Sequence, residues 1–379
     1  MSFNVLLKRR VVKNFSLVFF FLFINGCSVF TDTNDLYDTT HKTNHQILNT
    51  PFQNDSANVV DSMLYLAPEL TPLMQSPEQL IDLLGFHHIT EENLASLRAK
   101  EQAKVYRPKP DVRVDKVAIK GSQTQPDVNV YVINADQKTK RPVILYMHGG
   151  GYILGKASDS VVGLQNLAKQ HDCVIVSVDY RLAPETPFPG ALEDNYTALT
   201  WLYNNADKLG VDKNRIVIMG KSAGGGHAAM LAIAARDRGE VPIKHQILIY
   251  PMLDDRTGST RKTPASIGQF LWTETSNKFG WSALLGQPAG IEHVPYGAVP
   301  ARVENLTDLP PAFIQVGSID LFVEENIDYA KRLIQAGVAT ELVVLPGMFH
   351  SAENVFRETK VAKRFKIVMN KAIEKALSK

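Results

Sequence analysis

Short apolar runs alternate with amphipathic segments from residue 111 towards the C-terminus. The runs are rich in β-branched residues and have the length of buried strands. They cover residues 128–133, 143–147, 174–178, 216–219, 247–250, 312–316 and 342–345. The segments between them are long enough for crossover helices. This alternation predicts an α/β fold with a mostly parallel sheet and helices on both faces.

Two regions depart from this rhythm. Residues 59–107 have a helical pattern, with a capping box at 76–79 and a second helix start at Thr90, and predict an N-terminal helical cap segment. Residues 254–300 lose the strand pattern and contain Trp272 and Trp281. An aromatic insertion after a strand end can roof a pocket, so we expect a cap insertion here within a catalytic domain spanning 108–379.

The first 27 residues predict an export signal. Basic residues between Lys8 and Lys13 precede an apolar stretch, Phe15 to Ile24, that is too short for a typical membrane span. Cys27 follows in a sequence that resembles a bacterial lipobox, which predicts lipidation and anchoring in the cell envelope, in an outer membrane if the cell has one. An ordinary signal peptide with an incidental cysteine is the alternative. Polar residues 28–58 predict a flexible tether.

Composition narrows the choice of partner. The 379-residue chain has a formal net charge of +2 and 21% charged residues, so it lacks the strong positive charge that is typical of nucleic-acid-binding proteins. A small-molecule substrate is therefore expected. No metal-binding motif is present, and neither a metal nor a cofactor is expected. Cys173, the other cysteine, lies in an apolar run and is predicted to be a buried thiol. Oligomeric state is not indicated.

Two glycine-rich motifs carry the candidate chemistry, and each follows an apolar run. In residues 220–224, G-K-S-A-G, the glycines allow a sharp turn from strand to helix with Ser222 at its tip. In residues 149–151, three glycines can bring backbone N–H groups close to a substrate carbonyl. With the N–H of Ala223, they predict an oxyanion hole formed by Gly149, Gly150, Gly151 and Ala223. A G-x-S-x-G string alone would carry little weight.

A serine nucleophile needs a base and an acid that orients the base, and the expected order along the chain is serine, acid, histidine. Asp320 and His350 each follow a predicted strand in that order. The rival acids at 324–325 lie where a helix starts and suit its dipole. The rival base His227 lies too close to Ser222 on the same predicted helix, and His148 suits a structural role in the glycine loop.

Two residues beside these motifs are candidates for substrate binding. Tyr152 directly follows the three glycines, and Lys221 directly precedes the serine. A cation beside the nucleophile should favour anionic substrates and disfavour a protonated His350.

With these motifs the chain resembles the hormone-sensitive-lipase branch of the α/β-hydrolases, bacterial esterases and lipases with an H-G-G-G motif. The resemblance spans about 108–379 and includes residues 179–185 and 188–194. It implies Ser222 as nucleophile, His350 as base, Asp320 as orienting acid and a cap built from the N-terminal helices and the 254–300 insertion. It also implies that Arg181 and Glu185 stabilise the fold through ion pairs.

The predicted function is that of a serine carboxylesterase acting on short-chain acyl esters without a cofactor. An amidase, a lactonase or a deacetylase would use the same triad, and the sequence leaves these alternatives open. A lipid-anchored binding protein that keeps the hydrolase fold without turnover is the alternative from another class. Its expected signature is a broken triad, whereas Ser222, Asp320 and His350 are all present.

Overall fold

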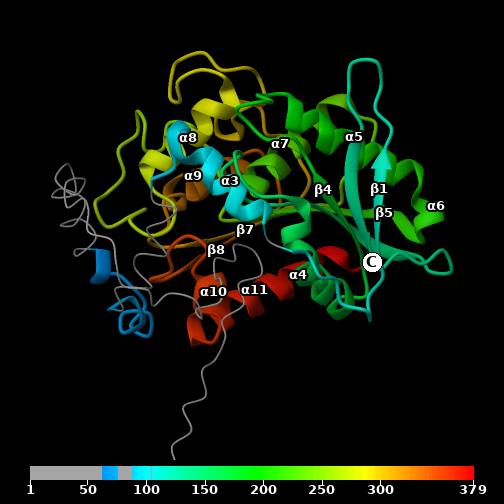
Figure 1. Cartoon of the computed structure of the whole chain (residues 1–379), viewed down its shortest axis with the longest axis horizontal. Coiled ribbons are helices and arrows are strands. Elements are labelled where there is room, and N and C mark those ends of the chain that lie inside the picture. The colour runs from blue at the N-terminus through cyan, green and yellow to red at the C-terminus, as the bar shows by residue number, and fades with distance from the viewer. Residues whose placement is uncertain (1–61, 76–87, 104) are drawn as a thin grey trace, which may run out of the picture.

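The computed structural model describes residues 62–75, 88–103 and 105–379 (Figure 1). The predicted export signal with Cys27, the tether at 28–58 and the capping box at 76–79 lie outside the described residues and stay predictions. Within the described ranges, no helix combines the length and the apolar character that a membrane span requires.

An eight-stranded sheet forms the centre of the molecule, in the order β1-β2-β4-β3-β5-β6-β7-β8. The strands are β1 (Val114–Ile119), β2 (Val128–Ile133), β3 (Arg141–Met147), β4 (Val174–Asp179), β5 (Val211–Lys221), β6 (His245–Ile249), β7 (Ala312–Gly317) and β8 (Thr340–Leu345). β2 pairs antiparallel with β1 and β4, and all other neighbouring strands are parallel. The predicted α/β class with a mostly parallel sheet is therefore confirmed.

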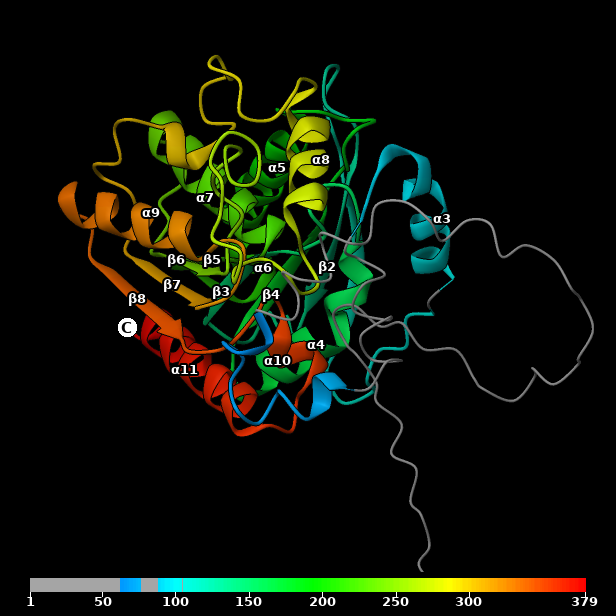
Figure 2. The same cartoon turned by 90° about the vertical axis from the view of Figure 1, so that its left-hand side faces the viewer.

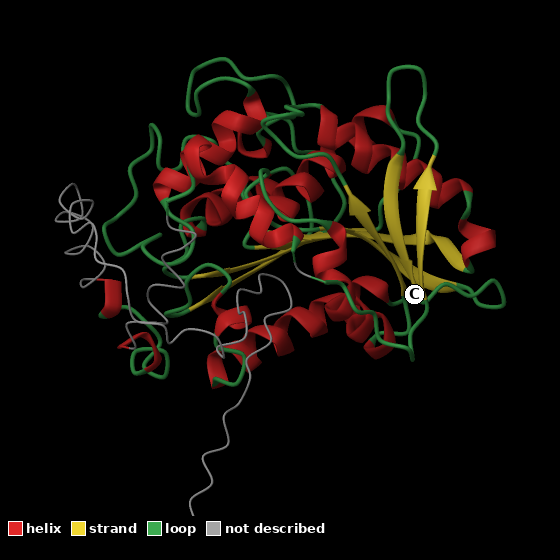
Figure 3. Ribbon diagram, in the orientation of Figure 1, coloured by secondary structure: helices red, strands yellow, loops and turns green. Residues whose placement is uncertain are grey.

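Helices cover both faces of this sheet (Figures 1 and 3). They are α3 (Glu91–Gln102), α4 (Ala157–Gln170), α5 (Gly190–Asn204), α6 (Ala206–Leu209), α7 (Ala223–Arg238), α8 (Glu274–Leu285), α9 (Val323–Gln335), α10 (Ala352–Val355) and α11 (Lys360–Leu377), with short 3-10 turns at Leu73–Gln75 and Pro300–Arg302. α4 and α11 pack on one face, and α5, α7, α8 and α9 lie on the other (Figure 2). Each face has its own apolar core.

The seven apolar runs all form strands, because a sheet covered on both faces buries both sides of each strand. All seven residues of β3 except Arg141 are buried, as are all six of β7. β1 is the strand that the pattern missed. It lies at the edge of the sheet, and five of its six residues are partly or fully exposed, so its sequence lacks a continuous apolar run.

The parallel register brings the candidate residues to one edge of the sheet. Met147 at the end of β3 lies beside Gly220 near the end of β5, and Gly317 at the end of β7 lies beside Leu345 at the end of β8. The loops that follow these ends carry the three glycines, Ser222 and the two other triad candidates. This is the edge where open α/β sheets bind ligands.

Parts of the two predicted cap segments lie within the described residues, and their role as a cap stays a prediction. α3 begins directly after Thr90, as predicted, and its Arg98 contacts the loop after β3 by donating to the backbone oxygen of Ile153 (2.9 Å). The 254–300 insertion contains α8. Its two tryptophans differ in place: Trp272 borders the cavity beside Ser222, whereas Trp281 is wholly buried in the core.

Candidate active site

Ser222 is the single residue between β5 and α7, and it has the strained backbone angles φ 57° and ψ −125°. The neighbouring glycines make this turn feasible. A Cβ on Gly220 would lie 2.0 Å from the backbone oxygen of Gly224, and a Cβ on Gly224 would lie 2.2 Å from that of Met147. The turn therefore fits only glycine at both positions and presents the serine at the tip, as the motif predicts.

Three predicted residues form one hydrogen-bonded relay. Ser222 Oγ lies 2.9 Å from His350 Nε2, and His350 Nδ1 lies 2.8 Å from Asp320 Oδ2. The second carboxylate oxygen of Asp320 accepts from the backbone N–H of Phe322 (2.9 Å), which fixes the carboxylate. All three side chains are buried. The geometry is that of a serine, its general base and an orienting acid.

Two aromatic rings hold the imidazole of His350 from its sides. The ring of Tyr250 meets it edge-on with centroids 4.7 Å apart, and the ring of Phe322 does so at 5.1 Å. These contacts leave the imidazole little freedom to turn away from the serine. Preorganisation of this kind lowers the cost of reaching the reactive geometry.

The glycine loop lies against the serine. A Cβ on Gly149 would lie 3.4 Å from that of Ser222, and Gly150 adopts a φ of 131° that a side chain would strain. Gly149, Gly150 and Gly151 line the same cavity as Ser222. Ala223 is the first residue of α7, so its N–H has no acceptor within the helix. The three glycines thus line the cavity with Ser222, and Ala223 directly follows it in sequence; their role as an oxyanion hole stays a prediction.

His148 supports this loop and is not part of the relay. Its Nδ1 donates to the backbone oxygen of Gly149 (2.8 Å), and its ring stacks on Tyr180 with centroids 4.2 Å apart. Burial lowers the pKa of His148. His227 lies on α7, where burial and then the charge of His148 lower its pKa to about 3. Neither ring approaches the serine, in agreement with the sequence prediction.

Tyr152 does not line the cavity. Its side chain is 1% exposed, its hydroxyl donates to the backbone oxygen of Met252 (2.8 Å), and its ring packs edge-on against Trp281 at 5.0 Å. The residue has a positive φ of 70°. The predicted substrate contact of Tyr152 is therefore wrong, and the residue fixes the glycine loop to the core.

Lys221 does line the cavity, but its charge is paired. Its Nζ lies 3.1 Å from Glu353 Oε1, which also accepts from the hydroxyl of Tyr250 (2.7 Å). Burial opposes the charge on the lysine, yet Glu353 and Tyr146 together outweigh this effect and raise the pKa of Lys221. Sequence reasoning missed Glu353. The available signal was an acidic residue three positions after His350 on a segment that must lie near the nucleophile.

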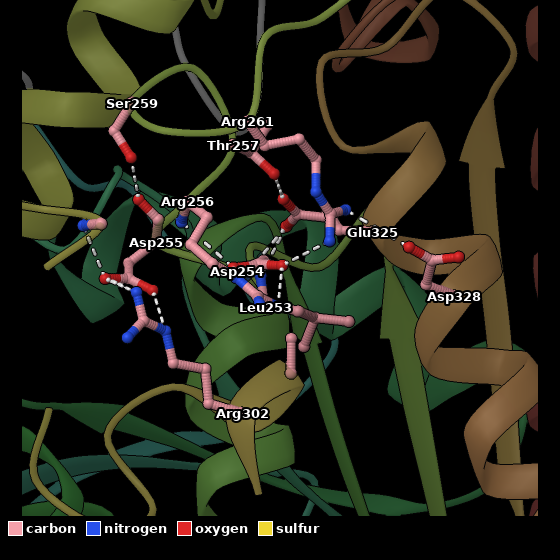
Figure 4. Close-up of polar contacts among 12 residues, drawn as sticks. Leu253, Asp254, Asp255, Arg256, Thr257, Ser259, Arg261, Arg302, Glu325 and Asp328 are labelled. Atoms are coloured by element: carbon pink, nitrogen blue, oxygen red, sulfur yellow. Dashed lines mark hydrogen bonds and ion pairs between the residues drawn. The ribbon is translucent and has the colours of Figure 1, made fainter. Parts of the chain in front are cut away.

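Glu325 is another buried carboxylate, and it lies among polar residues of the segment that follows β6 (Figure 4). Glu325, in the first turn of α9, accepts from the backbone N–H groups of Leu253 (2.6 Å) and Asp254 (3.3 Å) and from the hydroxyl of Thr257. Asp254 pairs in turn with Arg256 and with Arg261. Glu325 therefore fixes the segment after β6 and takes no part in the relay, in line with its dismissal as a rival acid.

Two further sequence predictions are confirmed. Arg181 pairs with Asp194 (2.8 Å), and Glu185 pairs with Arg98 of α3 (2.5 Å). Cys173 is a buried free thiol, and burial above all raises its pKa to about 12, so it is inert as a nucleophile.

A cavity of about 360 Å³ opens beside Ser222 and His350. α4 and α11 supply much of its wall, and Leu271 and Trp272 close it from the insertion. Within 62–75, 88–103 and 105–379, no group of histidine, cysteine or acidic side chains is arranged to hold a metal ion.

Comparison with known proteins gives a consistent result. The profile of a family described as alpha/beta hydrolase fold matches residues 144–354. The chain is 32% identical to Esterase LipI of Mycobacterium tuberculosis over 280 residues, which is 73% of this chain and 85% of the relative. It is 35% identical to Carboxylesterase NlhH of the same species over 219 residues, 56% of this chain and 67% of the relative.

Solved structures agree with these sequence relatives. The structure of "Bacterial Heroin Esterase" superposes with a TM-score of 0.73 and 31% identity, over 84% of this chain and 100% of that chain. The esterase LipW from Mycobacterium marinum superposes with a TM-score of 0.65 and 31% identity, over 84% and 98% of the two chains.

Proposed function

Because the chain belongs to the α/β-hydrolase fold family, we propose that it is a carboxylesterase that cleaves short-chain acyl esters through an acyl-enzyme. The observation that carries the proposal is the relay from Ser222 through His350 to Asp320, with distances of 2.9 and 2.8 Å. The esterase relatives support the choice of an ester substrate.

In this mechanism Ser222 Oγ attacks the ester carbonyl while His350 Nε2 takes the hydroxyl proton. The carboxylate of Asp320 accepts a hydrogen bond from Nδ1–H of His350 and stabilises the imidazolium. The carbonyl oxygen becomes an oxyanion among the N–H groups of the glycine loop and Ala223. His350 then returns the proton to the leaving alcohol, and water, activated by the same base, hydrolyses the acyl-serine.

The preference for short acyl groups is supported by the cavity wall. Trp272 lies against Gly151, since a Cβ on that glycine would lie 2.0 Å from the indole ring. A bulky indole beside the oxyanion loop limits the space for a long chain.

The test is hydrolysis of p-nitrophenyl esters from acetate to palmitate, with Ser222→Ala as the control. We expect turnover that peaks at short chains and falls in the variant by about 10³-fold or more. Full activity in the variant would contradict the mechanism, and a peak at palmitate would contradict the chain-length proposal. Parallel assays on an anilide and a lactone separate the amidase and lactonase alternatives.

We further propose that the enzyme is exported and acylated at Cys27, on the order of basic, apolar and lipobox-like residues. The test is incorporation of labelled palmitate by cells expressing the full chain or Cys27→Ser. Equal labelling of both proteins would overturn the proposal.

A further inference from the structure

Three basic side chains from three different segments line the cavity that holds Ser222. Lys221 ends β5, Arg357 follows α10, and Lys366 belongs to α11. They lie close enough to interact: after burial, the charge of Arg357 and, more weakly, that of Lys221 lower the pKa of Lys366. Cations rarely gather in a partly buried place without a negative partner, because their mutual repulsion is weakly screened there.

One carboxylate offsets part of this charge. Glu353 is 1% exposed, and its Oε1 already accepts from Lys221 (3.1 Å), Tyr250 (2.7 Å) and the amide of Asn354 (3.0 Å). Lys221 pairs with this carboxylate through Oε1, whereas Oε2 is buried and has no hydrogen-bond partner among the described residues. The acidic residue in the cavity wall, Glu101, belongs to α3 and is held there by the backbone N–H of Gly155 (3.0 Å).

Arg357 and Lys366 form no ion pair with a described residue, although the carboxylates of Glu353 and, more weakly, Glu358 attract both cations. Arg357 Nε donates to the backbone oxygen of Asn354 (3.1 Å), but its Nη2 is buried and has no hydrogen-bond partner in the part of the chain that the structure describes. Lys366 lines the same cavity, where burial above all lowers its pKa. A buried guanidinium nitrogen without an acceptor is costly, so an acceptor from a ligand would be bound favourably.

We propose that the substrate is an ester carrying a carboxylate, which Arg357 and Lys366 bind while the scissile carbonyl lies at Ser222. A planar carboxylate matches the guanidinium fork. The nearby Glu353 disfavours a dianion such as phosphate, since a second negative charge would be repelled. This inference rests on the proposed esterase function, and it adds the substrate class to it.

The experiment compares acidic esters with neutral esters of matched shape. Monoethyl adipate against ethyl hexanoate places the carboxylate on the acyl side, and para-acetoxybenzoate against para-cresyl acetate places it on the alcohol side. The readout is the ratio of kcat/KM for the acidic and the neutral ester. Arg357→Gln and Lys366→Gln are the test variants, and Lys363→Gln, an exposed α11 lysine paired with Glu358, is the matched control.

In one of the two arms we expect Arg357→Gln to lower this ratio by about tenfold or more, because charged hydrogen bonds are the strong ones. Lys366→Gln lowers it less, and Lys363→Gln leaves it unchanged. Neutral esters keep their kcat/KM to within about threefold in all three variants, which shows intact folding. The arm that responds identifies the side of the ester that carries the carboxylate. Raising the ionic strength reduces the ratio of the native enzyme.

The inference is overturned if the ratio is unchanged in both test variants while neutral esters are cleaved; the proposed function then stands. If no ester is cleaved, the proposed function fails instead. Calorimetric titration with hexanoate, a monoanion, separates this case, because weaker binding to Arg357→Gln than to Lys363→Gln supports the anion site independently of turnover. Equal binding to the two variants overturns it.

Discussion

Asp320 and Glu325 are two buried carboxylates five residues apart, and they serve different ends. Asp320 contacts the imidazole of His350, and in the proposed mechanism it stabilises the charge that develops on that ring. Glu325 faces the backbone N–H groups of Leu253 and Asp254, which carry no changing charge. The comparison of Asp320 with Glu325 indicates that burial alone does not identify a catalytic acid. The partner of the carboxylate decides whether it acts in chemistry or in folding.

The largest expected effect is on the catalytic side of this comparison. Asp320→Asn keeps the shape of the side chain but favours the wrong tautomer of His350, so kcat/KM for a short ester should fall by about 10³- to 10⁴-fold. The free energy of unfolding should change little, by about 1 kcal/mol. Steady-state kinetics and urea unfolding check both. Activity within tenfold of the native enzyme would show that Asp320 does not act as the orienting acid.

The structural role of Glu325 is tested by the pH dependence of the free energy of unfolding. Burial, and then the Asp254 carboxylate, raise the pKa of Glu325 well above its ordinary value. The folded protein therefore keeps a proton that the unfolded chain has released, and the stability from this group, complete below the ordinary pKa, is lost as pH rises from about 4.5 towards the folded pKa. Glu325→Gln removes this dependence of the free energy of unfolding on pH.

Urea unfolding at several pH values between 5 and 8 measures that effect. We expect Glu325→Gln to become more stable relative to the native protein as pH rises, with kcat/KM nearly unchanged. Glu324→Gln, a change one residue away in the same helical turn, is the matched control and should run parallel to the native protein. If the free energy of unfolding of Glu325→Gln also followed that of the native protein at every pH, the raised pKa of Glu325 would be refuted.

The smallest effect concerns a single hydroxyl. Thr257 is 2% exposed and hydrogen-bonds to Glu325, so Thr257→Val removes one buried hydrogen bond. We expect a loss of about 1 kcal/mol in the free energy of unfolding and no change in turnover. In Glu325→Ala the same threonine change should cost less, because the partner is already missing. A full additional loss in the double variant would mean that the two side chains are not coupled.

Much of the fold was predictable because of how the sheet is covered. Strands such as β3 and β7 are buried on both faces, so their sequences are continuous apolar runs. The edge strand β1 escaped because its side chains are mostly exposed and its sequence includes Asp115 and Lys116. A hydrophobic pattern reveals a strand because the side chains of the strand are buried, and few side chains of an edge strand are buried.

The triad was predictable for a related reason. In a parallel sheet the ends of strands meet at one edge, so residues 222, 320 and 350 could be brought together without knowing any distance. Tyr152 failed because adjacency in sequence does not reveal side-chain direction. Arg357 and Lys366 were missed because only the docking of α11 against the sheet places them beside the serine.

The turn from His350 to Glu353 links two parts of the site that are otherwise separate. This turn carries His350 and, three residues later, Glu353, whose carboxylate pairs with Lys221. Ser351 between them has a left-handed backbone conformation, and Glu353 lies in the four-residue helix α10 that follows it. A local opening of this segment would withdraw both at once, while the β-sheet stays intact. Inactivation in mild denaturant should therefore be a single reversible step that precedes global unfolding, and diluting the denaturant should restore activity without refolding of the core.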